Sequence, residues 1–398
     1  MCTQGSSQHE LKKLVVGNRG QILIVSFDGA NFTITGKYVN QNWMPSWMIF
    51  KDPNLLYAVN AIGDETSVFK LQPDFSTYSN LIRPKFDVIH GSLTKLFYDK
   101  PTFVSSFGGS IGGVHLVFNA DKTRLVQPCY RSGEIIVWDS SAADGSLKFM
   151  KTLTILGTLT PGWNHHRPHQ AVLDPTGRFF VVPNLSADTL QIIDTKDDLY
   201  EITGLVVVRM GFEPRRVAFL INGGATFMVS LGELSNELSL QEIKYEYEYC
   251  TLRATAVGHY STYNKLHFER PVDAAASELE IARNQEDIYI SNRYTDDETD
   301  HIAHFKFKQD MGLARLEYVG KTSTSGLQPR SFSLSTDDEQ RFVFVGNEIG
   351  ESGLVALKRD PSTGILDPTP VATISNEELA AAGSTAGMNN GPQFVCEI

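Results

Sequence analysis

The chain has 398 residues, of which 41% are hydrophobic and 20% charged, a balance typical of a soluble globular protein with a large core. Its formal net charge of −11 argues against nucleic-acid binding, which needs clustered lysines and arginines. No apolar run is long enough to cross a bilayer, so we expect neither a transmembrane helix nor a membrane partner.

The N-terminal segment bears on the cellular compartment. Residues 1–13, MCTQGSSQHELKK, contain no apolar segment of a secretory signal, which favours a cytoplasmic protein. Secretion becomes the expectation if Met1 replaces a removed signal peptide. The sequons at Asn31 and Asn184 would then be candidates for glycans.

Neither the cysteines nor the histidines predict a bound metal, and we expect no cofactor. The four cysteines lack zinc-binding spacing. Cys2 and Cys396 could form a disulfide if the chain ends meet, and two reduced thiols are the simpler interpretation. The run WNHHRPH at 163–169 is rich in histidine, but neighbouring residues of a strand point to opposite faces. His165 and His166 therefore do not readily share one ion.

A repeat of short strands runs along the sequence. Its copies alternate apolar and polar residues between turns rich in Asp, Asn and Gly, which predicts antiparallel strands. In chain order the copies are 13–29, 44–61, 111–139, 166–194, 213–243, 273–307 and 327–360. Roughly seven units of about 50 residues are typical of propeller blades with four strands each.

We therefore predict an all-β fold, a seven-bladed β-propeller in one domain over residues 1–398. The first copy lacks its leading strand, while the last residues, QFVCEI, resemble a strand. Pairing of the N-terminal and C-terminal strands would close the ring and remove its open edges. Residues 1–12 and 379–392 are expected to be flexible. Residues 75–110 and 245–272 should form loops or extra strands on one face.

The inner strands of a propeller surround its axis, so equivalent residues of the blades should meet at one level. The ends of the second strands contribute Arg19, Ala61, Tyr130, Leu185, Glu233, Arg293 and Glu348. The starts of the first strands contribute Ser46, His115, His169, Arg215, Glu278 and Arg330. Arginines can bind a carboxylate or polarise a carbonyl, and histidine with glutamate can transfer protons. The alternative is that arginines and glutamates only neutralise one another in a polar channel.

Aromatic residues near the same end of the ring would suit a flat or conjugated ligand. Trp43, Trp47 and Trp163 occupy or flank the leading turns, and Tyr130 belongs to the predicted ring. If these residues share one mouth, they form an aromatic wall for a small-molecule substrate that is apolar or aromatic. Packing between blades explains each tryptophan equally well.

Several motifs in chain order carry a family resemblance: PSW (45–47), HLVFNAD (115–121), CYRSG (129–133), PHQAVLDPTGRF (168–179), EPRRVAF (213–219), GELSN (232–236), ISNR (290–293) and QPRSF (328–332). With the ending GPQFVCEI, they make the chain similar to the lactonase family of seven-bladed propellers. That family includes bacterial 6-phosphogluconolactonases and the fungal 3-carboxymuconate lactonizing enzyme (carboxymuconate cyclase). The resemblance implies a structural role for Cys396 without a disulfide.

The resemblance also implies roles for four residues. Glu233 would be the general acid/base with His169 as its partner, while Arg215 and Arg293 would bind a carboxylate or carbonyl. Other positions depart from the family pattern and leave the substrate open: Arg167 replaces a histidine, Ala61 replaces a glutamate, Glu348 stands where glutamine is usual, and Arg19 is unusual at its level. The further candidates for substrate binding are Arg19, Ser46, Trp47, His115, Tyr130, Arg167, Glu278, Arg330 and Glu348.

Three functions are consistent with these residues. The first is an enzyme that opens or closes a ring on a small organic acid or ketone, as lactonases and muconate cyclases do. The second is a cyclase of specialised metabolism that acts on an apolar intermediate, by hetero-Diels–Alder cyclisation or by dehydration to a quinone methide. The third is a non-enzymatic scaffold that binds proteins, which the polar ring disfavours. The oligomeric state is not predicted.

Overall fold

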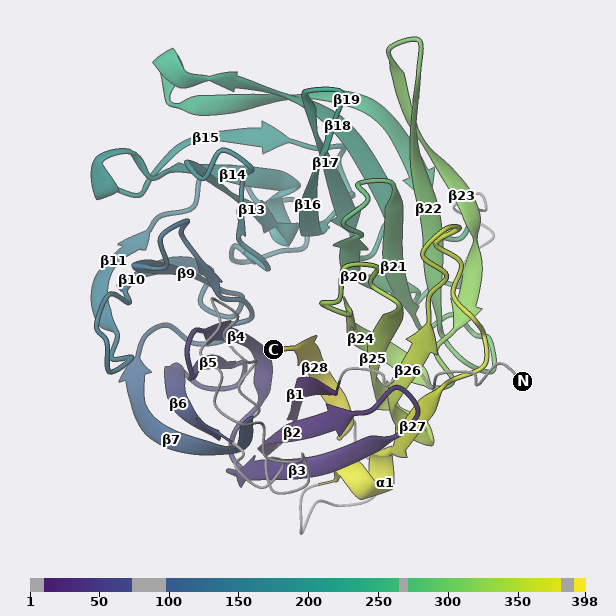
Figure 1. Cartoon of the computed structure of the whole chain (residues 1–398). Helices are drawn as coiled ribbons and strands as arrows, with labels where there is room; N and C mark the ends of the chain where they lie inside the picture. The colour runs from purple at the N-terminus through teal and green to yellow at the C-terminus, as the bar shows by residue number, and fades with distance from the viewer. Residues whose placement is uncertain (1–10, 74–97, 265–270, 381–389) are drawn as a thin grey trace, which may run out of the picture.

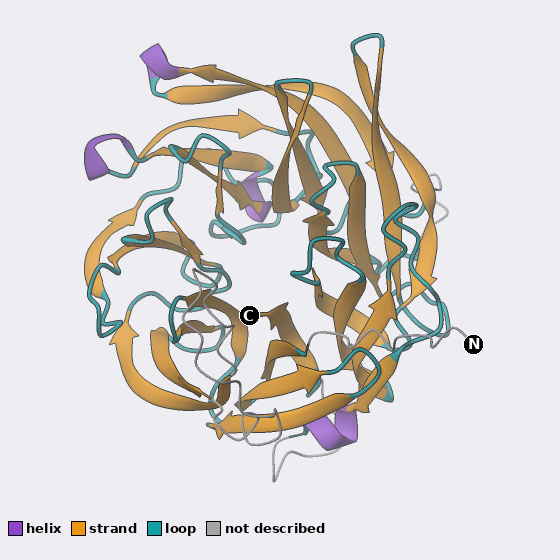
Figure 2. Cartoon of the chain, in the orientation of Figure 1, coloured by secondary structure: helices purple, strands orange, loops and turns teal. Residues whose placement is uncertain are grey.

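The computed structural model describes residues 11–73, 98–264, 271–380 and 390–398. These residues form seven four-stranded antiparallel sheets, arranged as blades around a central axis (Figures 1 and 2). The predicted seven-bladed β-propeller is therefore confirmed. The mouth is defined here as the end of the ring at which the innermost strands begin.

The strands of each blade are given from the axis outward. Blade 1 contains β28 (Pro392–Glu397), β1 (Lys12–Asn18), β2 (Gln21–Phe27) and β3 (Phe32–Val39). Blade 2 contains β4 (Pro45–Lys51), β5 (Leu55–Asn60), β6 (Glu65–Pro73) and β7 (Tyr98–Gly108). Blade 3 contains β8 (Val117–Phe118), β9 (Arg124–Cys129), β10 (Glu134–Asp139) and β11 (Lys148–Leu153). Blade 4 contains β12 (Val172–Leu173), β13 (Phe179–Asn184), β14 (Thr189–Asp194) and β15 (Glu201–Val207).

The last three blades complete the ring. Blade 5 contains β16 (Pro214–Asn222), β17 (Ala225–Gly232), β18 (Glu237–Glu246) and β19 (Thr251–Ser261). Blade 6 contains β20 (Ala275–Ile281), β21 (Asp287–Arg293), β22 (His301–Asp310) and β23 (Leu313–Ser323). Blade 7 contains β24 (Leu327–Leu334), β25 (Phe342–Ile349), β26 (Ser352–Lys358) and β27 (Ala372–Ser375). The short helix α1 (Asn376–Leu379) follows, and single 3-10 turns lie at Leu185–Ala187, Lys196–Asp198 and Tyr247–Tyr249.

The two ends of the described chain close the ring. Strand β28 pairs with β1 in antiparallel register, with Leu14 opposite Glu397 and Val16 opposite Val395. It is the innermost strand of blade 1 and also packs against β24 and β4 of the neighbouring blades. Figure 1 shows the C-terminus at the inner edge of the ring. The predicted closure by N- and C-terminal strands agrees with this pairing.

The hydrophobic core is divided between neighbouring blades. In the described part of the chain, each of the seven blade–blade interfaces contains one cluster of buried apolar side chains. Between blades 5 and 6, for example, Leu220 and Phe227 pack against Ile288 and Phe305. Each such side chain contributes about 1.5–3 kcal/mol when it is fully buried. The apolar core therefore lies mainly between the blades.

In blades 2, 5, 6 and 7 a β-bulge interrupts the innermost strand close to the mouth. The register shifts occur between Pro45 and Met48, Pro214 and Arg216, Ala276 and Leu279, and Pro329 and Ser331. A bulge breaks the alternation of side chains and redirects them locally. Consecutive residues of these strands can therefore both reach the axis.

The segments predicted as insertions or flexible tails fall partly on regular strands. Strands β7 and β19 supply parts of 75–110 and 245–272 and are the outermost strands of their blades. Residues 74–97 and 265–270 lie outside the described residues, as do 1–10 and 381–389 within the predicted flexible tails.

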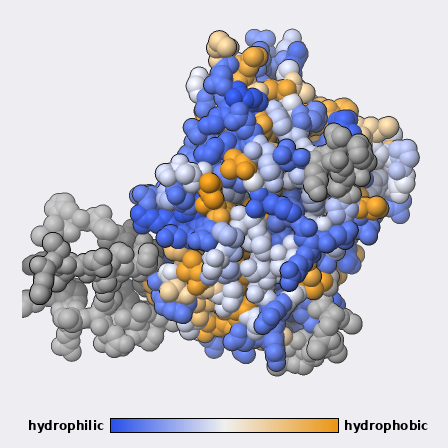
Figure 3. Space-filling view, turned by 90° about the vertical axis from the view of Figure 1, so that its right-hand side faces the viewer, coloured by the Kyte–Doolittle hydropathy of each residue, from blue (hydrophilic) through white to orange (hydrophobic). Residues whose placement is uncertain are grey.

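The surface is mainly polar on the face shown in Figure 3, where apolar side chains are scattered among hydrophilic ones. No helix among the described residues is long and apolar enough to cross a membrane. One of the two sequons is inaccessible, because Asn184 is fully buried and its side chain accepts a hydrogen bond from the backbone N–H of Arg167. A glycan at Asn184 is therefore incompatible with the folded chain, whereas Asn31 is exposed.

Candidate active site

A carboxylate shared by two arginines lies at the mouth of the propeller. Glu233 follows β17, and its side chain is 14% exposed. One carboxylate oxygen, Oε2, accepts a hydrogen bond of 3.0 Å from Nη1 of Arg215 at the start of β16. The other, Oε1, accepts one of 2.6 Å from Nη2 of Arg293 at the end of β21. These three residues and His169 are called the axial cluster below.

His169 joins this cluster through Arg215. Nη1 of Arg215 lies 2.7 Å from Nε2 of the imidazole ring. An arginine can only donate, so Nε2 accepts and the proton of the neutral ring is on Nδ1. This Nδ1 is buried and has no hydrogen-bond partner among the described residues. Arg215 therefore links the two candidate proton-transfer groups, which make no direct hydrogen bond to each other.

Ser277 fixes the guanidinium of Arg215 from the other side. Its backbone carbonyl accepts from Nε at 2.9 Å, and its hydroxyl lies 3.2 Å from Nη2. The hydroxyl itself donates to the carbonyl oxygen of Arg330 at 2.8 Å. With these positions occupied, Nη1 is directed toward Glu233 and His169. Ser277 is a positioning residue that sequence reasoning did not identify.

Burial and charge set the protonation states of the axial cluster. Burial would raise the pKa of Glu233, but Arg215 and Arg293 outweigh this effect and hold the pKa at about 2. Burial, and then the positive charge of Arg215, keeps the pKa of His169 well below its usual value. Burial also lowers the pKa of Arg215 to about 9, against the opposing effect of Glu233. Near neutral pH the cluster thus contains an ionised glutamate and a neutral histidine.

A second layer lies beneath the axial cluster. Arg216 forms a buried ion pair with Glu278, with 2.8 Å between Nε and Oε1. The guanidinium carbon of Arg216 lies 4.7 Å from the ring centroid of Trp47. The Trp47 ring also packs against the rings of His115 and Phe394, at centroid distances of 4.1 Å and 5.0 Å. Three predicted ligand-binding residues therefore meet here, packed against one another.

Four other predicted residues lie near the axial cluster. The ring of Tyr130 meets that of His169 at 5.5 Å, and the guanidinium of Arg167 stacks on Tyr130 at 4.7 Å. Nη1 of Arg330 lies 3.3 Å from Oε1 of Glu348. The mouth therefore combines arginines with aromatic rings.

Some predicted site residues lie apart. Arg19 is exposed in the turn between β1 and β2, and Ser46 is buried in β4 with a hydroxyl that has no hydrogen-bond partner among the described residues. No described interaction joins either residue to the axial cluster. Trp43 is 1% exposed and belongs to the core between blades 1 and 2, which corresponds to the packing interpretation of that tryptophan.

Arg216 was not among the predicted residues. On a regular strand it would point away from Arg215, but the bulge between Pro214 and Arg216 removes that alternation. The matching bulge between Ala276 and Leu279 lets Ser277 bind Arg215 while Glu278 binds Arg216. The available signal was the unusual Pro-Arg-Arg sequence at 214–216.

Glu280 is an acid without an ion-pair partner among the described residues. It lies on β20, two residues beyond Glu278. Burial, and then the Glu278 carboxylate, raises the pKa of Glu280 to about 8. The neighbouring Cys396 is also affected, since burial and then Glu280 raise the pKa of its thiol to about 12. Glu280 is therefore mostly protonated at neutral pH.

Replacing Glu280 by glutamine is expected to stabilise the protein above about pH 4.5. Between pH 4.5 and 8 the folded state keeps a proton that the unfolded state has lost, so the wild type loses stability as pH rises. Glutamine cannot titrate, so the variant does not lose stability in this way. The free energy of unfolding of the variant minus that of the wild type should therefore grow by up to about 1.4 kcal/mol per pH unit as pH rises through this range. Urea unfolding of both proteins at several pH values measures it. Glu351→Gln at an exposed position is the control, and a difference for Glu280→Gln that stays constant with pH would contradict the assignment.

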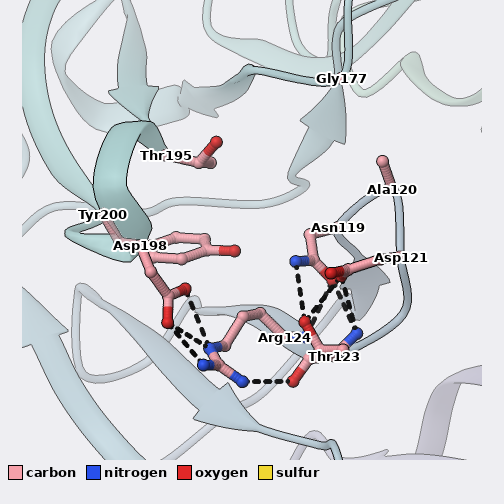
Figure 4. A pocket seen from close by; sticks show the side chains of 9 residues that line it. All are labelled: Asn119, Ala120, Asp121, Thr123, Arg124, Gly177, Thr195, Asp198 and Tyr200. Atoms are coloured by element: carbon pink, nitrogen blue, oxygen red, sulfur yellow. Dashed lines mark hydrogen bonds and ion pairs between the residues drawn. The ribbon is translucent and has the colours of Figure 1, made fainter.

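A separate cavity of about 390 Å³ lies between blades 3 and 4, at the end of the ring opposite the mouth (Figure 4). Its arginine, Arg124, pairs with Asp198 at 2.5 Å and with Asp139 at 3.1 Å. Asp121 accepts hydrogen bonds from the backbone and hydroxyl of Thr123. These groups satisfy one another, so we interpret the cavity as a polar contact between blades. The described residues contain no cluster of metal-ligating side chains there or elsewhere.

Comparison with known proteins gives consistent results. Residues 12–379 match the family model described as "Lactonase, 7-bladed beta-propeller". A probable 6-phosphogluconolactonase of Arthroderma benhamiae is 25% identical over 375 residues, covering 92% of this chain and 86% of the relative. A periplasmic gluconolactonase structure from Pseudomonas aeruginosa is similar with a TM-score of 0.74 and 18% identity, covering 98% and 99% of the two chains. The structure of a putative 6-phosphogluconolactonase from Bacteroides fragilis is similar with a TM-score of 0.70 and 16% identity, covering 94% of this chain and 99% of the other.

Proposed function

Because the chain belongs to the lactonase family of seven-bladed β-propellers, we propose that it hydrolyses the ring ester of a small lactone at the axial cluster. The observation that carries this proposal is the sharing of Glu233 between two buried arginines, one of which also binds His169. Two guanidinium groups facing one carboxylate leave an excess of positive charge. Such an excess favours a substrate or transition state that develops negative charge on oxygen.

The proposed reaction adds water to the lactone carbonyl carbon. Arg215 and Arg293 stabilise the negative charge on the carbonyl oxygen, while Glu233 takes the proton of the attacking water. Collapse of the tetrahedral intermediate breaks the ring C–O bond. The leaving alkoxide then receives the proton from Glu233, and the product is the open hydroxy acid.

Substrate binding would also change the basicity of the cluster. In the resting site, Arg215 and Arg293 hold the pKa of Glu233 at about 2, against the effect of burial, which makes its carboxylate a weak base. When a substrate oxygen accepts hydrogen bonds from these arginines, the carboxylate loses part of their stabilisation and becomes more basic. When Arg215 donates to the substrate instead, Nε2 of His169 loses its hydrogen-bond donor. Nε2 then becomes a second atom that can accept a proton. Proton transfer is thereby coupled to the presence of substrate.

Hydrolysis of sugar-acid lactones tests the proposal. We expect the wild type to open glucono-δ-lactone or its 6-phosphate faster than the spontaneous reaction, followed in a pH-stat. Arg293→Lys keeps the charge but loses the forked donor, and should lower kcat/KM by about 10²- to 10³-fold. Arg315→Lys, in an exposed ion pair with Asp310, is the matched control and should leave the rate unchanged. Absence of hydrolysis for every lactone in such a panel would overturn the proposal.

A ring-closing reaction is the second candidate, because aromatic side chains adjoin the arginines. Tyr130 packs against His169, and Arg293 lies 5.6 Å from the ring centroid of Tyr294. These rings would suit a flat, conjugated or apolar intermediate in a cyclase of specialised metabolism. A protein that is inactive on lactones but binds such a ligand between Glu233 and Arg293 would favour this candidate. An empty cluster with a protein partner on the rim would favour a scaffold.

A further inference from the structure

Two aromatic rings contact the guanidinium of Arg167 at the mouth. Its guanidinium carbon lies 4.7 Å from the ring centroid of Tyr130 and 4.5 Å from that of Trp163. Both contacts are within the range of cation–π interactions, so the side chain is restricted without any acid. Its Nε is buried and has no hydrogen-bond partner among the described residues.

The four other arginines of this region that are buried or half-buried each face a carboxylate. Arg215 and Arg293 share Glu233. Near the axial cluster Arg330 pairs with Glu348, and in the layer below Arg216 pairs with Glu278. Arg167 makes no ion pair with any carboxylate in the described part of the chain. A guanidinium without a carboxylate partner beside the axial cluster can bind an anion, even in a protein with a net charge of −11.

The backbone of Arg167 is also fixed. Its N–H donates to Oδ1 of the buried Asn184 at 2.8 Å, and its carbonyl accepts from the N–H of Leu185 at 3.1 Å. Tyr130, on which the guanidinium stacks, meets His169 at 5.5 Å between ring centroids. Tyr130 therefore contacts both the guanidinium of Arg167 and the imidazole of the axial cluster.

We propose that Arg167 forms an anion-binding subsite for a carboxylate or phosphate group of the substrate, remote from the ester that reacts. The two rings contact the guanidinium without using its N–H donors, which arginine can direct to an oxyanion as two parallel hydrogen bonds. The reaction in this inference rests on the proposed lactone hydrolysis. Binding of the anion does not, because it requires only the geometry of Arg167, Tyr130 and Trp163.

The kinetic test compares Arg167→Gln with the wild type on a charged and an uncharged lactone. For 6-phosphoglucono-δ-lactone, kcat/KM should fall by about 10- to 100-fold, mainly through a higher KM, because one charged hydrogen-bonding partner is lost. For glucono-δ-lactone the change should stay within about 2-fold, as expected for a group that contacts only the anion. Arg131→Gln, at the exposed residue after Tyr130, is the control for loss of charge at the mouth. Equal losses on both lactones would reduce Arg167 to a structural role and overturn the subsite.

Calorimetric titration tests binding without turnover. The probes are gluconate, 6-phosphogluconate with a remote phosphate, and glucarate with a remote carboxylate. We expect 6-phosphogluconate or glucarate to bind more tightly than gluconate, and this preference to disappear in Arg167→Gln. The probe that gains affinity identifies the anion. If the preference exists in a protein that opens no lactone, the subsite stands and the proposed reaction fails. If both probes bind no better than gluconate, the subsite is overturned whatever the activity.

Discussion

Truncation after Asn390 is expected to leave no cooperatively folded protein. The change removes β28, whose Phe394 and Val395 are almost fully buried, and exposes the inner edge of β1. Loss of one buried phenylalanine side chain alone costs about 3–5 kcal/mol. Loss of the whole strand should exceed the stability of a typical domain, about 5–15 kcal/mol. Circular dichroism and thermal unfolding of the truncated chain measure this effect.

Strand addition provides the control for this truncation. A synthetic peptide of residues 391–398 should restore folding when it is supplied in excess, because its backbone can pair with β1 as β28 does. A peptide of the same composition in scrambled order should not. A truncated protein that unfolds at the wild-type temperature would show that closure does not stabilise the ring.

Glu233→Gln is expected to remove activity and to destabilise the fold together. The variant leaves Arg215 and Arg293, whose side chains are 4% and 6% exposed, without their shared counter-ion. Removal of one partner from a buried ion pair costs about 3–5 kcal/mol. Activity on the lactone that the wild type hydrolyses should fall by about 10²- to 10⁴-fold, the contribution of a general base. Urea unfolding and steady-state rates of the folded variant measure the two effects.

Three controls separate charge from packing in this variant. Phosphate ions should restore part of the stability of Glu233→Gln, since an anion can replace the carboxylate between the arginines. The double variant Glu233→Gln/Arg215→Gln should be less destabilised than Glu233→Gln alone. Glu237→Gln breaks the more exposed pair with Arg209 and should cost no more than about 1 kcal/mol. A small loss for Glu233→Gln with no phosphate effect would mean that the arginines are solvated.

The fold could be predicted from sequence because its main signals are local. Alternation of apolar residues and the turns between strands repeat in every blade, and the unpaired first copy indicates closure. The outermost strands were harder to identify, as β7 and β19 show. Most side chains of β19 are exposed or only partly buried, so it lacks the apolar alternation that marks the strands nearer the axis.

The axial cluster could be located from sequence, but its internal contacts could not. The repeats placed Glu233 and Arg293 on one predicted ring and His169 and Arg215 on a second one. The family resemblance singled out these four residues, and the structure brings them together. Strict alternation gave no reason to place Arg216 at the axis, because bulges are not visible in a repeat pattern. Which arginine faces which glutamate depends on the register between different blades, and no single strand encodes that register.

The closing strand also has a consequence for biosynthesis. Phe394 of β28 packs against Trp47, which lies beneath the axial cluster together with His115 and Arg216. A growing polypeptide on the ribosome makes Trp47 early and Phe394 only after all the other strands. The layer under the cluster is therefore complete only after β28 has emerged from the ribosome, and earlier translation intermediates carry the arginines without their finished support.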